Sequence, residues 1–325
     1  MTHSDTSPDE AHTFAPATTR RFARTDVGSP DQPETVVVRD LEYARRATGP
    51  LLLDLHLPAR TVVVPPVVVW LHGGGWRKGD RSFAPDLDRY FAARGYAMAN
   101  VEYRLSGEAT FPAQLDDVRA AVRWLRDSAD DFGLDASSIG LWGSSAGGHL
   151  AALAATTATD DRDRVQAVVD GYGPTDFALA DAQALPGGMP HAPADSPESE
   201  LLGVPLGEAD VDLLRAVNPI AHITPAAPPF LILHGTADLL VPPGQSEILH
   251  AALAAAGVEA TLCLIDGLGH AFLTGRQFES RPCPPVSIRS FVPSRGERIA
   301  SGPSATFELI ERFLDRHLRR DPWDR

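Results

Sequence analysis

From Pro66 onward, short continuous apolar runs alternate with longer segments whose apolar residues recur at helical spacing. Apolar runs without polar alternation are typical of parallel strands that are buried on both faces of a sheet. Strands are expected at Val67–Leu71, Tyr96–Tyr103, Ile139–Trp142, Ala167–Asp170, Phe230–His234 and Ala260–Ile265. Helices are expected at Pro85–Ala93, Pro112–Ala129, Ala146–Ala155, Gln245–Ala256 and Ala305–Leu318. This alternation restricts the chain to an α/β fold, whose ligands bind beyond the carboxyl ends of the strands.

The segments outside this alternation suggest how the chain is organised. Residues 1–33 are rich in Thr, Asp, Ser and Pro and are expected to be a disordered or loosely attached leader. Residues 34–325 are predicted to be one domain, because a single large α/β sheet commonly reaches this length. The domain opens with two expected antiparallel strands, Glu34–Asp40 and Pro50–Pro58. Stretches rich in Pro and Gly near 171–229 and 273–303 are predicted to be loop insertions that shape a site.

Composition and charge argue against several classes of partner. The net charge of −14 leaves no basic stripe for nucleic acid or anionic lipid. The two cysteines, Cys263 and Cys283, form no zinc-like spacing, so no metal is predicted, and no disulfide is expected between them. The longest apolar stretch, Thr61–Leu71, is shorter than the roughly 20 residues of a membrane-spanning helix. The leader shows no apolar signal-peptide core, so a cytoplasmic protein without membrane partners is expected.

A candidate nucleophile lies between the strand expected to end at Trp142 and the helix expected to begin at Ala146. Gly143-Ser-Ser145-Ala-Gly147 matches the pattern G-x-S-x-G in the strand–turn–helix context that a nucleophile elbow requires. Glycines two residues before and after Ser145 allow a tight turn with an exposed hydroxyl. Ser144 lacks glycines at these two offsets, so Ser145 is the predicted nucleophile.

A second glycine motif suggests how negative charge on a reacting oxygen is stabilised. The strand at Val67–Leu71 leads into His72-Gly-Gly-Gly-Trp76, where backbone N–H groups can approach a ligand without obstruction by Cβ atoms. The predicted oxyanion donors are the N–H groups of Gly74, Gly75 and Ala146, the last being the residue after the nucleophile. Each such donor contributes about 3 to 4 kcal/mol of transition-state stabilisation.

The remaining members of a triad are expected after two later strands. Asp238 follows the strand at 230–234 and His270 follows the strand at 260–265, so the order along the chain is Ser, Asp, His. Asp266 is the competing acid, but it lies on the same short loop as His270, which makes Asp238 the preferred choice. His149 and His234 are expected to be structural.

Two aromatic residues and one insertion are expected to control access. Trp76 and Tyr172 are predicted to contact substrate and to narrow an acyl pocket, which favours short acyl chains from acetyl to butyryl. The insertion 273–303 begins close to His270, and its apolar and arginine residues suggest a wall or lid of the site. A surface insertion without a role is the alternative.

Together these motifs resemble the esterase/lipase family of α/β-hydrolases that carry an HGGGW motif, including hormone-sensitive-lipase-like and feruloyl-esterase-like carboxylesterases. The matching segments are His72–Trp76, Tyr103–Ser106, Phe111–Gln114 with Asp117, Gly143–His149, Gly171–Asp176, Leu233–Asp238 and Gly267–Phe272. The resemblance runs from about Leu53 to Phe272 and resumes over the C-terminal helix. It implies the α/β-hydrolase fold, and it implies that Arg104 and Asp117 are structural partners.

The implied activity is cofactor-free hydrolysis of a small-molecule carboxylic ester through an acyl-enzyme. Two alternatives stay open. Kynurenine formamidases resemble the same motif and cleave an amide with the same groups, and a non-catalytic receptor or scaffold can retain the fold. The sequence does not indicate the natural alcohol, the acyl group or the oligomeric state.

Overall fold

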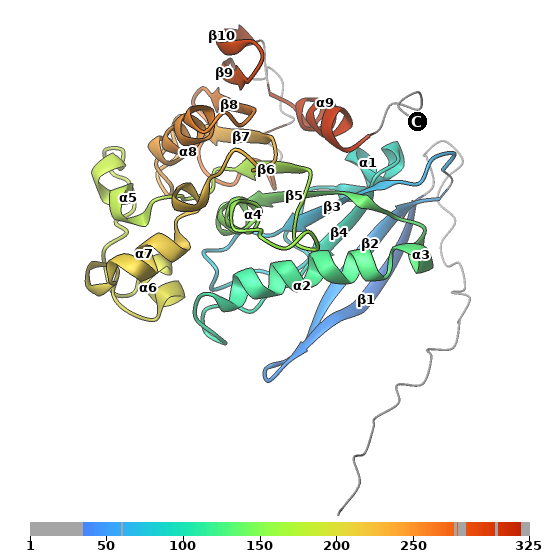
Figure 1. Cartoon of the computed structure of the whole chain (residues 1–325). Helices are drawn as coiled ribbons and strands as arrows, with labels where there is room; N and C mark the ends of the chain where they lie inside the picture. Colours follow the sequence, from blue (N-terminus) through green and yellow to red (C-terminus); the bar gives the residue numbers. More distant parts are fainter. Residues whose placement is uncertain (1–34, 60, 276–277, 279–283, 303–304, 320–325) are drawn as a thin grey trace, which may run out of the picture.

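The computed structural model describes residues 35–59, 61–275, 278, 284–302 and 305–319. Its centre is a ten-stranded sheet with the order β1-β2-β4-β3-β5-β6-β7-β8-β9-β10 (Figure 1). The strands are β1 (Thr35–Arg46), β2 (Gly49–Pro58), β3 (Pro66–Leu71), β4 (Ala97–Val101), β5 (Asp135–Ser144), β6 (Ala167–Gly171), β7 (Phe230–Gly235), β8 (Ala260–Ile265), β9 (Val286–Val292) and β10 (Gly296–Gly302).

The middle of the sheet is parallel and its two margins are antiparallel. Strands β4, β3, β5, β6, β7 and β8 pair in parallel. The hairpin β1–β2 joins one margin through β4, and the hairpin β9–β10 joins the other through β8. Every residue of β3, β4, β6 and β7 is buried, which is why these strands are continuous apolar runs. The predicted α/β fold and its antiparallel entry are confirmed.

Helices lie on both faces of the sheet and beside it. The α-helices of the described residues are α1 (Leu87–Tyr90), α2 (Ala113–Asp127), α3 (Ala129–Phe132), α4 (Ala146–Thr156), α5 (Phe177–Gln183), α6 (Pro197–Leu202), α7 (Val211–Val217), α8 (Gly244–Ala255) and α9 (Phe307–Leu318). Helices α2, α4 and α8 share one core with alternate residues of β3, and α1 and α9 share the other (Figure 1). Successive strand residues point to opposite faces, so Val67 and Val69 enter one core and Val68 and Trp70 enter the other.

The stretch 171–229, expected to be a loop insertion, contains three short helices. Helices α5, α6 and α7 gather beside the sheet, at the left of Figure 1. Each begins after a residue whose side chain accepts a hydrogen bond from the first helical turn: Asp176, Ser196 and Asp210. These capping residues were readable in the sequence, but the helices are too short to show a clear apolar period.

The loop prediction for 273–303 is wrong over residues 286–302, where β9 and β10 extend the sheet. Leu264 and Ile265 of β8 pair with Ser287 and Val286 of β9. Phe278 is 2% exposed and packs between Phe272 and Phe307. Phe278, Val286 and Ile288 therefore pack in the core of the sheet, whereas Ile299 is exposed. The leader, its boundary at residue 33 and Cys283 lie outside the described residues, and the division into domains stays a prediction.

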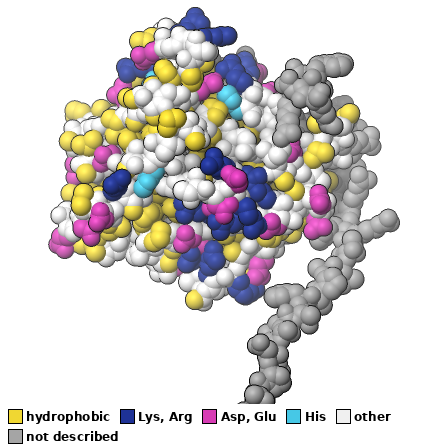
Figure 2. Space-filling model, viewed as in Figure 1, with side chains coloured by type: hydrophobic (Ala, Val, Ile, Leu, Met, Phe, Trp, Pro, Cys, Tyr) yellow, Lys and Arg dark blue, Asp and Glu magenta, His cyan; other side chains and the backbone are white. Residues whose placement is uncertain are grey.

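Charged side chains on the visible face of the molecule are mixed in sign (Figure 2). Basic side chains lie among acidic ones near α2, where Arg123 pairs with Asp163 at 2.6 Å and Arg162 pairs with Asp127 at 2.5 Å. This face offers no continuous basic stripe to a phosphate backbone. No helix within the described ranges is long and apolar enough to cross a membrane.

Candidate active site

Four segments of the predicted site meet at one edge of the sheet because each follows the carboxyl end of a parallel strand. The glycine run 73–75 follows β3, and Ser145 follows β5. Asp238 follows β7, and His270 follows β8. These strands are close neighbours in the sheet order, so residues up to two hundred positions apart in the sequence converge at this edge.

The side chains of Ser145, His270 and Asp238 form a continuous hydrogen-bonded chain. Ser145 Oγ lies 2.9 Å from His270 Nε2, and His270 Nδ1 lies 2.6 Å from Asp238 Oδ2. The structure therefore brings together all three residues that the sequence singled out. The competing acid, Asp266, is exposed and receives a 3.3 Å hydrogen bond from Thr236 Oγ1.

Ser145 lies at a strained turn between β5 and α4. Its φ of 55° and ψ of −122° place a non-glycine residue in a sparsely populated backbone region. A Cβ atom at Gly143 would lie 2.1 Å from the oxygen of Gly147, and one at Gly147 would lie 2.0 Å from the oxygen of Leu71. Only glycine fits at both positions, which is the physical reason for the G-x-S-x-G pattern.

Asp238 is buried and accepts hydrogen bonds at both oxygens. Its Oδ1 accepts from the backbone N–H groups of Leu240 and Val241, each at 2.9 Å. Its Oδ2 faces His270, and His234 Nε2 lies 3.3 Å away. Burial favours the neutral acid, but the hydrogen bonds from His234 and His270 outweigh it and hold the pKa of Asp238 well below its usual range. The acid is therefore a carboxylate at neutral pH.

The glycine run lies directly against the nucleophile. A Cβ atom at Gly73 would lie 3.3 Å from Cβ of Ser145. Gly74 and Gly75 have φ of +118° and +61°, and a Cβ atom at Gly74 would lie 2.0 Å from the oxygen of Lys78. Ala146 is the first residue of α4, where helical N–H groups have no intrahelical partner and the helix dipole favours negative charge. Gly73 therefore contacts Ser145 and Ala146 follows it directly, while the assignment of Gly74, Gly75 and Ala146 as oxyanion donors stays a prediction.

Trp76 and Tyr172 lie beneath the site rather than on an open surface. Each is 1% exposed. Trp76 packs edge-on against His149 with ring centroids 5.1 Å apart, and Tyr172 packs against His270 at 4.7 Å. This burial corrects the expectation of direct substrate contact, because both rings are occupied by core neighbours. The sequence showed bulky rings in loops but not which way they point.

The other structural expectations agree with the geometry. His149 is fully buried with Nε2 at 2.8 Å from the oxygen of Val217, and burial lowers its pKa to about 4. Arg104 Nε donates to Asp117 Oδ2 at 2.7 Å. The contact of His234 with the triad acid was missed, although His234 lies near the end of β7 and Asp238 comes four positions later.

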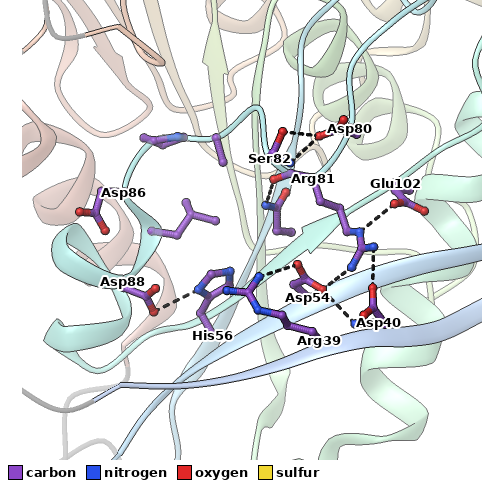
Figure 3. A pocket seen from close by; sticks show the side chains of 14 residues that line it. Arg39, Asp40, Asp54, His56, Asp80, Arg81, Ser82, Asp86, Asp88 and Glu102 are labelled. Atoms are coloured by element: carbon purple, nitrogen blue, oxygen red, sulfur yellow. Dashed lines mark hydrogen bonds and ion pairs between the residues drawn. The ribbon is translucent and has the colours of Figure 1, made fainter. Parts of the chain in front are cut away.

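A separate polar cavity of about 550 Å³ lies between the β1–β2 hairpin and residues 80–88 (Figure 3). Arg81 joins three carboxylates there, those of Asp40, Asp54 and Glu102. None of the residues that line the cavity belongs to the hydrogen-bonded chain of Ser145. The ion pairs attach the segment after the glycine run to the sheet. In the described part of the chain, His, Cys, Asp and Glu side chains form no cluster suited to holding a metal ion.

Comparison with known proteins places this site in a family. The model of the BD-FAE family matches residues 53–253, which include the glycine run, Ser145 and Asp238. The chain belongs to this family. Esterase LipQ of Mycobacterium tuberculosis is 34% identical over 202 residues, covering 59% of this chain and 46% of LipQ. Esterase LipC of the same organism is 31% identical over 224 residues, covering 64% of this chain and 53% of LipC. The chain therefore spans about half the length of these relatives.

Solved structures agree on the fold. A truncated carbohydrate esterase from gut microbiota superimposes with a TM-score of 0.65 and 29% identity, covering 75% of this chain and 92% of that one. Esterase Est2 of Thermogutta terrifontis with bound propionate has a TM-score of 0.58 and 26% identity, covering 75% and 87%. The BD-FAE chain described here has the α/β-hydrolase fold of these esterases.

Proposed function

We propose that this BD-FAE protein is a serine carboxylesterase that hydrolyses short-acyl esters through an acyl-enzyme. The observation that carries the proposal is the hydrogen-bonded chain from Ser145 through His270 to Asp238, with the glycine run beside it. The esterase relatives and the esterase structures support the same reaction. No cofactor enters this mechanism.

The reaction begins when Ser145 Oγ attacks the ester carbonyl. His270 Nε2, 2.9 Å away, takes the serine proton, and the carboxylate of Asp238 stabilises the imidazolium that forms. His270 then protonates the leaving alcohol, and the acyl group stays on Ser145. A water molecule deprotonated by His270 attacks this acyl-enzyme, releasing the acid and restoring the serine.

The negative charge on the carbonyl oxygen is assigned to the N–H groups of Gly74, Gly75 and Ala146. Preorganised donors of this kind stabilise the transition state more than the substrate, since charge develops only during the attack. The positive φ of Gly74 and Gly75 supports this assignment, because it lets the backbone turn without Cβ atoms in the way.

Short acyl chains remain the expected substrates. Structures of Est2 were determined with propionate and with butyrate bound, and those acids have the acyl lengths proposed here. Because Trp76 and Tyr172 are buried, the proposal now assigns them to the floor of the site instead of to direct contact. Whether residues 273–303 form a wall of the site stays a prediction.

The proposal is tested by comparing kcat/KM for p-nitrophenyl acetate, butyrate and laurate with that for N-formylkynurenine. Higher kcat/KM for the butyrate than for the laurate is expected. A clear preference for N-formylkynurenine would indicate an amidase. Failure of a fluorophosphonate to label Ser145 would indicate a non-catalytic protein.

The proposed partner is a small-molecule ester, without nucleic acid or membrane. The acidic composition and the mixed surface charge support the proposed absence of nucleic-acid and membrane partners, and a cytoplasmic location is part of the same proposal. The oligomeric state is left open.

A further inference from the structure

One segment runs from the loop of the triad acid to the glycine run. Residues 188–202 begin beside the loop of the triad acid, where the Met189 N–H donates to the oxygen of Leu239 at 2.7 Å. They end in α6, whose first residue, Pro197, lies against the glycine run. We call residues 188–202 the bridging segment. In the sheet order, β5, which leads to Ser145, lies between β3 and β7.

The contact with the glycine run is close. A Cβ atom at Gly75 would lie 3.0 Å from Cβ and 3.2 Å from Cγ of Pro197. Arg77 adds a polar contact, donating at 3.2 Å both to the oxygen of Asp195 and to Glu200 Oε1. A shift of α6 would therefore change the position of Gly75, whose N–H is assigned to the oxyanion.

A buried ion pair holds the bridging segment together. His191 Nδ1 lies 2.8 Å from Glu198 Oε1, and the two side chains are 1% and 3% exposed. The backbone N–H groups of His191 and Ala192 donate to the carboxylate of Asp181 on α5 at 2.6 and 3.0 Å. This arrangement connects the start of the segment, near the triad acid, to Glu198, the residue after Pro197.

The charge state of the pair follows from its neighbours. Burial opposes a charged imidazole, but Glu198, Asp181 and the backbone oxygen of Leu240 favour it and raise the pKa of His191. A buried charge pair constrains geometry strongly, because removal of one partner leaves the other uncompensated. The ester mechanism does not use either group, so the pair needs another explanation.

We propose that Glu198, held by His191, is a positioning residue that fixes Pro197 against Gly75 and so orients the Gly75 N–H toward the oxyanion. This inference rests on the proposed serine esterase function. The pair touches no reacting atom and acts only through α6 and the glycine run. Its loss should weaken binding of the transition state while leaving substrate binding nearly unchanged.

The test compares Glu198→Ala with Glu198→Gln, which keeps an acceptor for His191. Asp163→Asn is the matched control, because it removes the partner of Arg123 near the start of β6, at the opposite edge of the sheet from Ser145. Each variant is assayed with p-nitrophenyl butyrate and with a trifluoromethyl ketone, which forms a tetrahedral adduct with the serine. Thermal unfolding is measured for each protein.

For Glu198→Ala we expect kcat to fall about tenfold with KM within about twofold, below the 10²- to 10³-fold loss of a whole oxyanion donor. The inhibition constant of the ketone should rise by the same factor as kcat falls. Glu198→Gln should stay within about threefold of wild type, and Asp163→Asn within twofold. A folded Glu198→Ala with unchanged kcat, a loss confined to KM, or an equal loss in Glu198→Gln or Asp163→Asn would overturn the inference.

Should Glu198→Ala fail to fold, Pro197→Gly gives the same test without disturbing the ion pair. It removes both atoms that face Gly75, so kcat and ketone affinity should fall together. Unchanged values would overturn the inference. A wild-type protein that neither hydrolyses esters nor reacts with a fluorophosphonate would instead contradict the proposed function.

Discussion

Asp238 uses its two oxygens differently, and this makes Asp238→Asn an informative change. Oδ1 accepts from the backbone N–H groups of Leu240 and Val241, whereas Oδ2 lies 2.6 Å from His270 Nδ1. An asparagine has one oxygen and one NH₂ group. Because the two backbone donors require an acceptor, the amide oxygen takes the Oδ1 position and the NH₂ group faces His270.

The consequence is a histidine in the wrong tautomer. His270 must accept at Nδ1, so its proton moves to Nε2, which faces Ser145 Oγ at 2.9 Å. A protonated Nε2 cannot take the serine proton. The corresponding change in a serine protease triad lowers kcat about 10⁴-fold, or about 5.5 kcal/mol of transition-state stabilisation. We expect a loss of about 10³- to 10⁴-fold here, with KM within about threefold.

The assay is the initial rate of p-nitrophenyl butyrate hydrolysis at saturating substrate, with circular dichroism to check folding. Asp266→Asn is the matched control, because this exposed carboxylate follows β8 as His270 does and should leave kcat within twofold. Retention of a tenth or more of wild-type kcat by Asp238→Asn would refute the tautomer argument. So would a comparable loss in Asp266→Asn.

Three further outcomes are expected. Ser145→Ala and His270→Ala should each abolish nearly all turnover without unfolding, and the double variant should be no worse, since the residues act as a unit; near-normal rates in Ser145→Ala would contradict the mechanism. Across p-nitrophenyl esters, kcat/KM should fall from butyrate to laurate, and the reverse order would refute a short acyl pocket. Burial raises the pKa of Asp170 to about 6 despite the Gly173 N–H donor, so its ionisation destabilises the fold above pH 6 and this cost disappears as pH falls toward 4. Asp170→Asn should therefore increase the free energy of unfolding at pH 7.5 by up to about 3 kcal/mol and much less at pH 4; equal effects at both pH values in denaturant titrations would exclude this cause.

Much of the site was predictable because its chemistry lies in local sequence. The elbow around Ser145 needs glycine at two fixed offsets, since any Cβ there would collide with backbone. The acid and the base could be placed because parallel strands end at one edge, so residues that follow β7 and β8 must come near the residue that follows β5. Strand burial produced the continuous apolar runs from which the order of elements was read.

Where the predictions were wrong, the missing information was the direction of a side chain or the partner of a strand. Trp76 and Tyr172 follow strands that lead into the site, but only the packing of α4, α5 and the loop of His270 determines that both rings are buried. The strands β9 and β10 lack a strong apolar alternation and form because β8 offers an unpaired edge.

The sequence by itself therefore determined the α/β architecture, the elbow at Ser145, the glycine run and the candidate acid and base, because each depends on periodicity or on steric limits within a few residues. Only the tertiary structure decided that His234 contacts Asp238, that His191 pairs with Glu198 and that Pro197 lies against Gly75. The contact of Pro197 with Gly75 joins segments more than a hundred residues apart. Even the closer pairs depend on how the intervening chain turns, and packing of the whole domain sets that geometry.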